Sequence, residues 1–252
     1  MEFVPNSIDG SASLILVGVS LLGAFITAAA GIGGGIVLLA VMATLMPTSA
    51  VIPVHGAVQI GANGARAALQ RAHIDWRTFV YFGLGSVVGI GIGGSVVVSL
   101  PADILRAGLA LFILYTVWGP KLRMVSEGKL IIAVIGLIAS FLTMFFGATG
   151  TFIAGLLNQR GYTPREMVAT HSVCMGAQHI LKVVTFAVLG FAFAEWVGLI
   201  ALMMLAAVLG TYLGSLVLNR LPAETFAIGI KAILTLLSLN LLATAAGLYR
   251  LI

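Results

Sequence analysis

The chain has 252 residues, of which 60% are apolar and 8% are charged, and its mean hydropathy is +1.15. Soluble domains carry roughly a quarter charged residues, so this composition excludes a soluble globular protein. The net charge of +5 is spread over short connections without a polybasic tail, which argues against a nucleic-acid partner. We expect an all-α integral membrane protein in a lipid bilayer, with about eight to ten membrane segments of roughly 20 residues each.

Apolar windows give the order of the expected helices. They cover about 11–46, 51–69, 78–100, 104–118, 130–157, 167–189, 197–218 and 223–248. The first 65 residues contain no Lys or Arg, so the first window lacks the basic start of a cleavable signal peptide and is predicted to be a retained span. The polar stretch GPKLRMVSEGK separates a first transmembrane repeat, 1–120, from a second, 130–252, with 121–129 as a cytoplasmic connecting loop.

The two halves resemble each other. A shift of 116 residues carries Phe25, Thr27, Gly31, Gly34, His55 and Arg66 onto Phe141, Thr143, Gly147, Gly150, His171 and Lys182. The shift grows to 120 for Trp76 and Trp196, and to 121 for Gly89, Gly93 and Pro101 against Gly210, Gly214 and Pro222. Chance alignment of apolar, glycine-rich sequence is the alternative, but a matched histidine and cation within a span favour a true repeat.

The distribution of basic residues favours an inverted arrangement. The first and fifth windows are long and are interrupted by glycines, GIGGG at 31–35 and GATG at 147–150. If each forms a hairpin that returns to its starting side, the N-terminus is outside and these residues are all inside: Arg71, Arg77, Lys121, Arg123, Lys129, Arg160, Arg165 and Arg220. Only Arg106 and Arg250 then lie outside, whereas eight single crossings would split the basic residues between both sides.

Each half would therefore hold a glycine-broken helical hairpin plus three transmembrane helices. Five passes per half is an odd number, so the second half is inverted relative to the first, as in many secondary transporters. The second arms of the hairpins are short for a full crossing and are predicted to be re-entrant half-helices that stop near the midplane.

A polar face lies within the second window. His55, Gln59 and Asn63 recur at intervals of four, and Arg66 follows three residues later. The matching face in the other half carries His171, Met175, His179 and Lys182, with Gln178 adjacent. One alternative is that the histidines bond a neighbouring helix and that Arg66 reaches the membrane surface. We favour a binding site, because desolvating these groups is costly without a partner or a cavity.

The sign of the intramembrane charge indicates the substrate. Lys182, Lys231 and Arg66 lie within windows, although Lys231 has the weaker claim and is equally suited to a dimer contact or a lipid head-group region. Acidic residues lie at or near the ends of windows: Asp75, Asp103, Glu127, Glu166, Glu195 and Glu224. This pattern predicts a small anionic substrate, held by cations, histidines and the N–H groups that follow each glycine break.

The predicted substrate-binding residues are Gly31, Gly33, Gly34, Gly35, His55, Gln59, Asn63, Arg66, Gly147, Thr149, Gly150, Thr151, His171, Met175, Gln178, His179 and Lys182. Because histidine titrates near neutral pH, His55 or His171 is expected to take up a proton as the site opens alternately to the two sides. Oligomeric state stays open, with a homo-oligomer among the alternatives.

Other classes of protein fit less well. Soft-metal ligation by Cys174 and its neighbours lacks a carboxylate or a second thiolate, and an enzyme would need a reactive pair, so neither a metal, a cofactor nor an enzymatic activity is expected. A dinucleotide site is disfavoured because the glycines follow no strand. An anion channel, which would use the same positive lining, remains the main alternative.

The sequence FITAAAGIGGGIVLLAVM at 25–42, the polar helix after it and the second copy FLTMFFGATGTFIAGLL at 141–157 resemble a known family. They are similar to the sulfite exporter TauE/SafE family of membrane transporters, and the resemblance covers nearly the whole chain. It implies a multi-pass protein of a prokaryotic inner membrane that moves sulfite, an organosulfonate or another small sulfur-containing oxyanion. The second copy departs from the first, with GATGT where the first has GIGGG.

Overall fold

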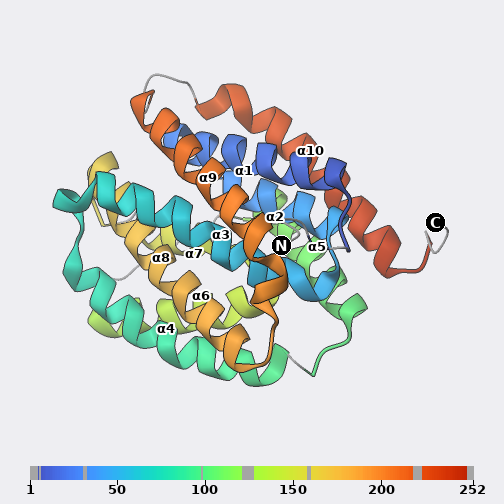
Figure 1. Ribbon diagram of the computed structural model, residues 1–252. Coiled ribbons are helices and arrows are strands. Elements are labelled where there is room, and N and C mark those ends of the chain that lie inside the picture. The colour runs from blue at the N-terminus through green and yellow to red at the C-terminus, as the bar shows by residue number, and fades with distance from the viewer. Residues whose placement is uncertain are drawn as a thin grey trace.

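The computed structural model describes residues 5, 7–30, 33–97, 99–120, 128–157, 160–217 and 223–248. These residues form ten α-helices and two short 3₁₀ helices, with no strand among them (Figure 1). The elements are α1 (Gly10–Ala30), α2 (Gly34–Leu45), α3 (Thr48–Leu69), η1 (Arg71–His73), α4 (Trp76–Val97), α5 (Ala102–Trp118), α6 (Lys129–Phe146), α7 (Gly150–Leu157), α8 (Pro164–Val188), η2 (Phe193–Trp196), α9 (Val197–Leu216) and α10 (Ala223–Ala245). The expectation of an all-helical protein is confirmed for this part of the chain.

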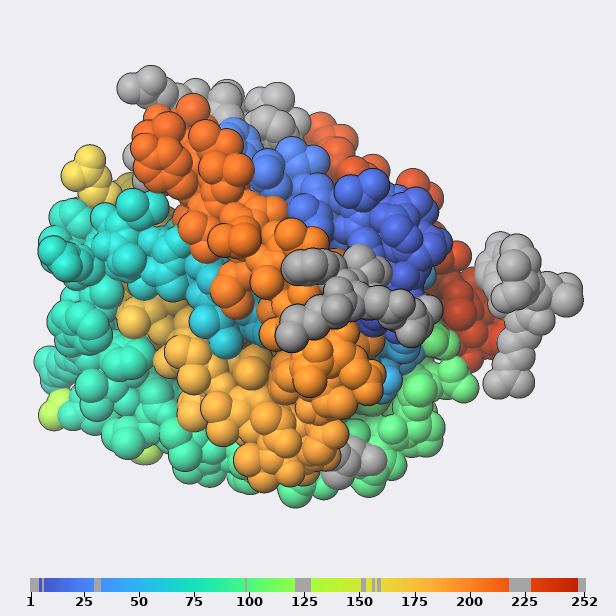
Figure 2. Space-filling model, viewed as in Figure 1, coloured from blue at the N-terminus to red at the C-terminus, as the bar shows by residue number. Residues whose placement is uncertain are grey.

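The helices form one bundle in which α3 crosses the middle (Figure 1). On one side α1 packs against α9, and on the other α4 packs against α6. The two polar helices α3 and α8 pack against each other, and α9 and α4 flank them respectively. In the space-filling view α9 lies directly against α1, while α8 lies against α4 on the same face of the molecule (Figure 2).

Five helical segments of the described chain are long and apolar enough to cross a membrane. They are Gly10–Ala29, Trp76–Val97, Lys129–Phe146, Phe193–Leu216 and Ile228–Ala245. The helices α3 and α8, with 22 and 25 residues, are also long enough to cross a membrane, but their polar residues lower their mean hydropathy. Exposed Leu, Ile and Val side chains cover α4 and α9, as expected for surfaces that face lipid.

The first turn of α8 was not visible as an apolar window, because it is polar. Thr163 caps the helix by accepting from the backbone N–H of Glu166, and the Glu166 carboxylate accepts from the backbone N–H of Thr163. This capping box, followed by Pro164, starts the helix three residues before the predicted window at 167.

The predicted breaks at the two glycine motifs are confirmed. Helix α1 ends at Ala30 and α2 begins at Gly34, while α6 ends at Phe146 and α7 begins at Gly150. Gly33 has a φ of +115° and Gly147 a φ of +72°, which L side chains rarely adopt. With 12 and 8 residues, α2 and α7 are about 18 Å and 12 Å long at 1.5 Å per residue, too short to cross a bilayer core of about 30 Å.

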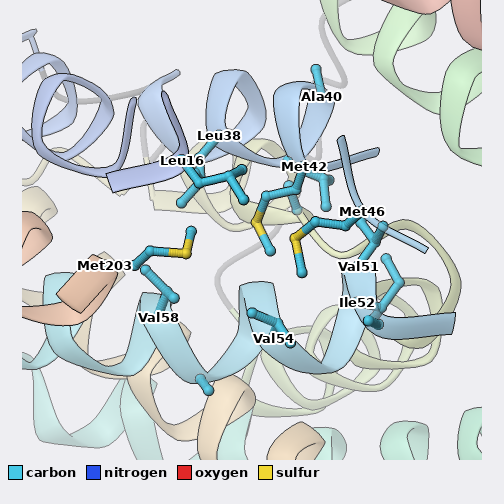
Figure 3. Packing of buried hydrophobic residues seen from close by; sticks show 14 of the residues in the cluster. Leu16, Leu38, Ala40, Met42, Met46, Val51, Ile52, Val54, Val58 and Met203 are labelled. Atoms are coloured by element: carbon cyan, nitrogen blue, oxygen red, sulfur yellow. The ribbon is translucent and has the colours of Figure 1, made fainter. Parts of the chain in front are cut away.

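A methionine-rich core joins the first broken helix to the centre of the bundle. Met42 of α2 and Met46, directly after that helix, point toward α3, where they lie near Val51 and Val54 (Figure 3). Met42 and Val54 have no exposed surface. Because Met is flexible and polarizable, it fills the space beside a helix that ends within the bundle.

Glycines allow the two outer helix pairs to approach backbone to backbone. In α4 a side chain at Gly89 would clash with the Leu137 carbonyl group of α6, and in α9 a side chain at Gly210 would clash with the Leu21 carbonyl group of α1. Leu137 is the residue onto which the 116-residue shift carries Leu21. The pairs α4–α6 and α9–α1 therefore meet at corresponding residues.

We predict that Gly89→Ala lowers the free energy of unfolding by about 1–3 kcal/mol, because the added methyl group meets backbone atoms that cannot rotate away. Gly91→Ala in the same helix is the matched control, since nothing lies within 4 Å of its Cβ position. Thermal unfolding of the two variants in detergent measures the difference. Equal midpoints would contradict the close approach of α4 to α6.

Candidate functional site

A cavity of about 60 Å³ lies between the two broken hairpins and the polar helices, and we call it the central cavity. Its walls come from α1, α2, α3, α8 and α9 and from the start of α7 with the turn before it. The lining residues are Ser20, Ala24, Thr27, Gly33, Gly34, Gly35, Ile36, Leu38, His55, Gln59, Ala62, Asn63, Arg66, Ala148, Gly150, His171, Met175, His179 and Ala207. Both glycine breaks and both polar faces therefore meet at one place.

The polar face of α3 supplies the charge of the central cavity. His55, Gln59, Asn63 and Arg66 are all buried, and Arg66 is only 5% exposed. The Arg66 guanidinium donates through Nη2 to Asn63 Oδ1 at 2.8 Å and through Nε to the Ala62 carbonyl at 3.4 Å. These acceptors are neutral, and no Asp or Glu is among the lining residues that the structure describes. The positive charge of Arg66 is therefore not neutralised within the cavity.

The matching face of α8 contributes His171, Met175 and His179. The His179 ring stands edge-on to the His55 ring, with 5.9 Å between their centroids. Nδ1 of His179 is buried and has no hydrogen-bond partner within the described chain. Because an unpaired buried polar atom is costly, this nitrogen is available to a ligand or to water.

Two histidines fasten the polar helices to the two broken hairpins. Nε2 of His55 lies 3.0 Å from the Gly35 carbonyl oxygen, and Nε2 of His171 lies 3.0 Å from the Gly150 carbonyl oxygen. The Gly150 carbonyl oxygen only accepts, so Nε2 of His171 carries the hydrogen and donates it, whereas Nε2 of His55 also lies 3.2 Å from the side-chain amide nitrogen of Gln59. Each histidine therefore fixes the first turn of the short helix beside it, α2 or α7.

Four predicted site residues lie outside the lining of the central cavity. Lys182 has no exposed surface and donates to the Gly147 carbonyl at 3.1 Å and to Thr143 Oγ1 at 3.4 Å. Gln178 donates to Ser140 Oγ at 2.8 Å and accepts from Thr149 Oγ1 at 3.1 Å. Lys182 and Gln178 thus brace the turn between α6 and α7, to which Gly147 and Thr149 belong.

Two further predicted residues fall outside what is described: Gly31 altogether, and Thr151 for its side chain. The structure adds lining residues that the sequence reasoning missed, among them Ser20 and Thr27 of α1 and Ala207 of α9. Thr27 donates to the Gly23 carbonyl at 2.9 Å and accepts from the Gly34 N–H at 3.0 Å, so it closes the first hairpin. The sequence could have pointed to Thr27 through its alignment with Thr143 in the second repeat.

The side chains of the central cavity suit an anion better than a metal ion. No group of three His, Cys, Asp or Glu residues able to hold a metal ion occurs in the described part of the chain. Cys174 is buried and is not among the lining residues. Guanidinium, amide and imidazole N–H groups are instead the donors that bind an oxyanion by charge-assisted hydrogen bonds.

A second polar cluster ties the connection before α4 to the loop before α8. Tyr162 and Thr78 both donate to the Asp75 carboxylate, and the Asp75 N–H donates to Thr170 Oγ1 at 2.9 Å. Burial raises the pKa of Asp75, but the hydrogen bonds that its carboxylate accepts, from the hydroxyls of Tyr162 and Thr78 and from the backbone N–H groups of Thr78 and Arg77, outweigh burial and hold the pKa below its ordinary value. Burial and the neighbouring carboxylate raise the pKa of Tyr162.

We predict that Gln178→Leu destabilises the protein by about 1–3 kcal/mol, because the buried hydroxyls of Thr149 and Ser140 lose their partner. Thermal unfolding without any added anion measures this loss. Asn240→Leu, at an exposed position of α10, is the control and leaves the midpoint nearly unchanged. An unchanged midpoint for Gln178→Leu would show that Gln178 does not brace the turn.

Residues 16–241, which include part or all of every described helix, match the protein family described as Sulfite exporter TauE/SafE. None of the curated proteins and none of the solved structures with which the chain was compared matches it. The matched region is far more than half of the 252 residues, and the apolar helices are those of a multi-pass membrane protein. The chain therefore belongs to the Sulfite exporter TauE/SafE family of membrane transporters.

Proposed function

We propose that the protein is a secondary transporter that exports a small sulfur-containing oxyanion, such as sulfite or an organosulfonate, across the cytoplasmic membrane. The substrate binds in the central cavity, between the first turns of α2 and α7. Arg66 supplies the charge, while Gln59, Asn63 and His179 offer neutral hydrogen-bonding groups around it. Family membership supports a sulfur oxyanion, and the site itself supports the anionic charge.

The unneutralised guanidinium of Arg66 is the observation that carries this proposal. A buried cation that meets only neutral acceptors is incompletely compensated, so an anion beside it gains both Coulomb energy and hydrogen bonds. A cavity of about 60 Å³ holds several water molecules and is on the scale of one small oxyanion. A cation substrate would meet repulsion from Arg66 and would lack a carboxylate ligand among the lining residues.

Transport by alternating access is the mechanism that we propose, with the two halves as inverted repeats. The packing of α9 on α1 at Gly210 and of α4 on α6 at Gly89 supports this arrangement, because corresponding residues meet in both pairs. The fastening of each short helix by an aligned histidine supports it further. The anion then lies where the two halves meet, and small rotations of one half against the other expose it to each side in turn.

We predict that Arg66→Met weakens sulfite binding about 10–100-fold, because a charged hydrogen-bond donor is worth about 1.5–3 kcal/mol. Binding of radiolabelled sulfite to the purified protein measures the loss, and flux into liposomes should fall with it. Arg77→Met is the matched control, since Arg77 is exposed at the start of α4. Unchanged sulfite affinity in Arg66→Met would refute the proposed site.

An anion channel is the competing function, and the same liposomes separate the two. A coupled transporter accumulates sulfite above its external concentration when a proton gradient is imposed, whereas a channel only lets the anion run down its own gradient. Proton uptake by His55 or His171 is the coupling that we propose.

We predict opposite membrane sides for two connections. In a Cys174→Ala background, Ala72→Cys in η1 should react with an impermeant thiol reagent only from the cytoplasmic side, and Ala192→Cys after α8 only from outside. Both positions are exposed. In the proposed topology α8 crosses the membrane once, from the cytoplasmic side to the outside. Labelling of both cysteines from one side would disprove that topology.

A further inference from the structure

A second cavity, of about 330 Å³, lies at one end of the bundle where α3 and α5 begin and α4 and α8 end. We call it the end cavity. Its lining residues are Thr48, Ser49, Ile52, Pro53, Val97, Leu100, Ala102, Leu105, Phe186, Leu189, Gly190 and Phe191. Arg106 adds a cation at its edge, where Nη2 donates to Thr48 Oγ1 at 2.6 Å, although Asp103 partly neutralises that charge at 3.3 Å.

The central cavity and the end cavity follow one another along the α3–α8 pair. On α8, His179 lines the central cavity and Phe186 lines the end cavity, with Lys182 between them. On α3, His55 lines the central cavity and Ile52 the end cavity. At 1.5 Å per residue, Lys182 lies about 4–6 Å along the helix from both His179 and Phe186.

Lys182 fills the layer between the two cavities. Its Cε lies 2.8 Å from the position of a Cβ at Gly56, so the absence of a side chain there makes room for the lysine. On its other side, the ammonium donates to the Gly147 carbonyl and to Thr143 Oγ1. The layer therefore consists of α3, the Lys182 side chain and the turn between α6 and α7.

The same turn also rests against the floor of the end cavity. A Cβ at Gly147 would lie 3.1 Å from Cδ1 of Ile52 and 3.0 Å from Cδ1 of Leu39. Ile52 lines the end cavity, so the turn packs directly behind the wall of that cavity. The turn therefore borders both cavities, since Ala148 lines the central one, and Lys182 bonds to it.

The two aligned cations are used differently in this structure. Arg66 lines the central cavity, and the hydrogen bonds described for it go to its own helix, whereas Lys182 is not among the lining residues and bonds to the hairpin of its own half. Both acceptors of Lys182 are neutral. A passing anion offers a stronger, charge-assisted hydrogen bond and is able to displace them.

We propose that Lys182 is the gating residue of an anion path that joins the central cavity to the end cavity. In the closed state its ammonium binds the Gly147 carbonyl and the Thr143 hydroxyl and seals the path. In the open state it releases these groups and pairs with the anion in transit. This inference rests on the proposed transport function, and it makes Lys182 a positioning residue for the turn rather than a ligand in the central cavity.

The experiment separates binding from translocation with radiolabelled sulfite. Lys182→Met should keep sulfite affinity within about 3-fold of the unmodified protein, yet reduce flux in liposomes at least 30-fold. Lys231→Met is the matched control, because Lys231 is an exposed lysine within an apolar helix. This variant should keep both its sulfite affinity and its flux. Loss of affinity in Lys182→Met equal to that in Arg66→Met would overturn the inference, as would unchanged flux.

A second measurement does not depend on sulfite being the substrate. In a Cys174→Ala background, Ala148→Cys reports on the turn from within the central cavity. Adding Lys182→Met should raise its reaction rate with an impermeant anionic thiol reagent, applied from the side of the end cavity, at least 5-fold. Thr143→Val, a milder change, should raise it less. Unchanged reaction rates of the cysteine in both variants would overturn the proposed gating role of Lys182. A protein that shows the rate changes but does not bind sulfite would overturn only the proposed function.

Discussion

The arrangement of the bundle depends on cations that are buried without carboxylates. Arg66 and Lys182 are both inside the protein, and neither forms an ion pair within the described chain. Each is instead stabilised by amide, carbonyl and hydroxyl oxygens, which compensate a charge only in part. A protein that keeps such groups in a low-dielectric interior has to surround them with polar backbone, with a cavity or with a ligand. This structure surrounds them with polar backbone and a cavity, and the proposed substrate would be the ligand.

The helix breaks supply this polar backbone. A continuous helix satisfies its own carbonyls and N–H groups, so it has little to offer a buried side chain. The turn at Gly147 frees its carbonyl near the middle of the bundle, where Lys182 bonds to it, while His55 and His171 bond to carbonyls in the first turns of α2 and α7. Non-helical backbone at membrane depth is tolerated where it is buried in protein or borders a cavity. In that position its polar groups can also bond to buried side chains.

The two halves share most of their helix contacts but differ in the position of one aligned pair of cations. Outer helix pairs meet through corresponding glycines, and both polar helices hold a short helix through an aligned histidine. The aligned cations differ, because Arg66 faces the central cavity while Lys182 bonds to the hairpin of its own half. Under the proposed alternating access, two inverted repeats have to differ from each other in any one state. We interpret the different positions of the two cations as that asymmetry.

Composition and spacing alone determined that the chain is helical and membrane-embedded, that it breaks at two glycine motifs and that α3 and α8 carry polar faces. These properties follow from local hydropathy, from the conformational freedom of glycine and from the helical period. All three are set by the local sequence and do not depend on which helices pack against it. Only the tertiary structure decided which polar residues share a cavity. Arg66 and His179 line it, whereas Lys182 and Gln178, on the same helix as His179, brace a turn. The helical period gives the direction of a side chain around its own axis, but the neighbouring helix decides whether that direction meets a cavity or a carbonyl group.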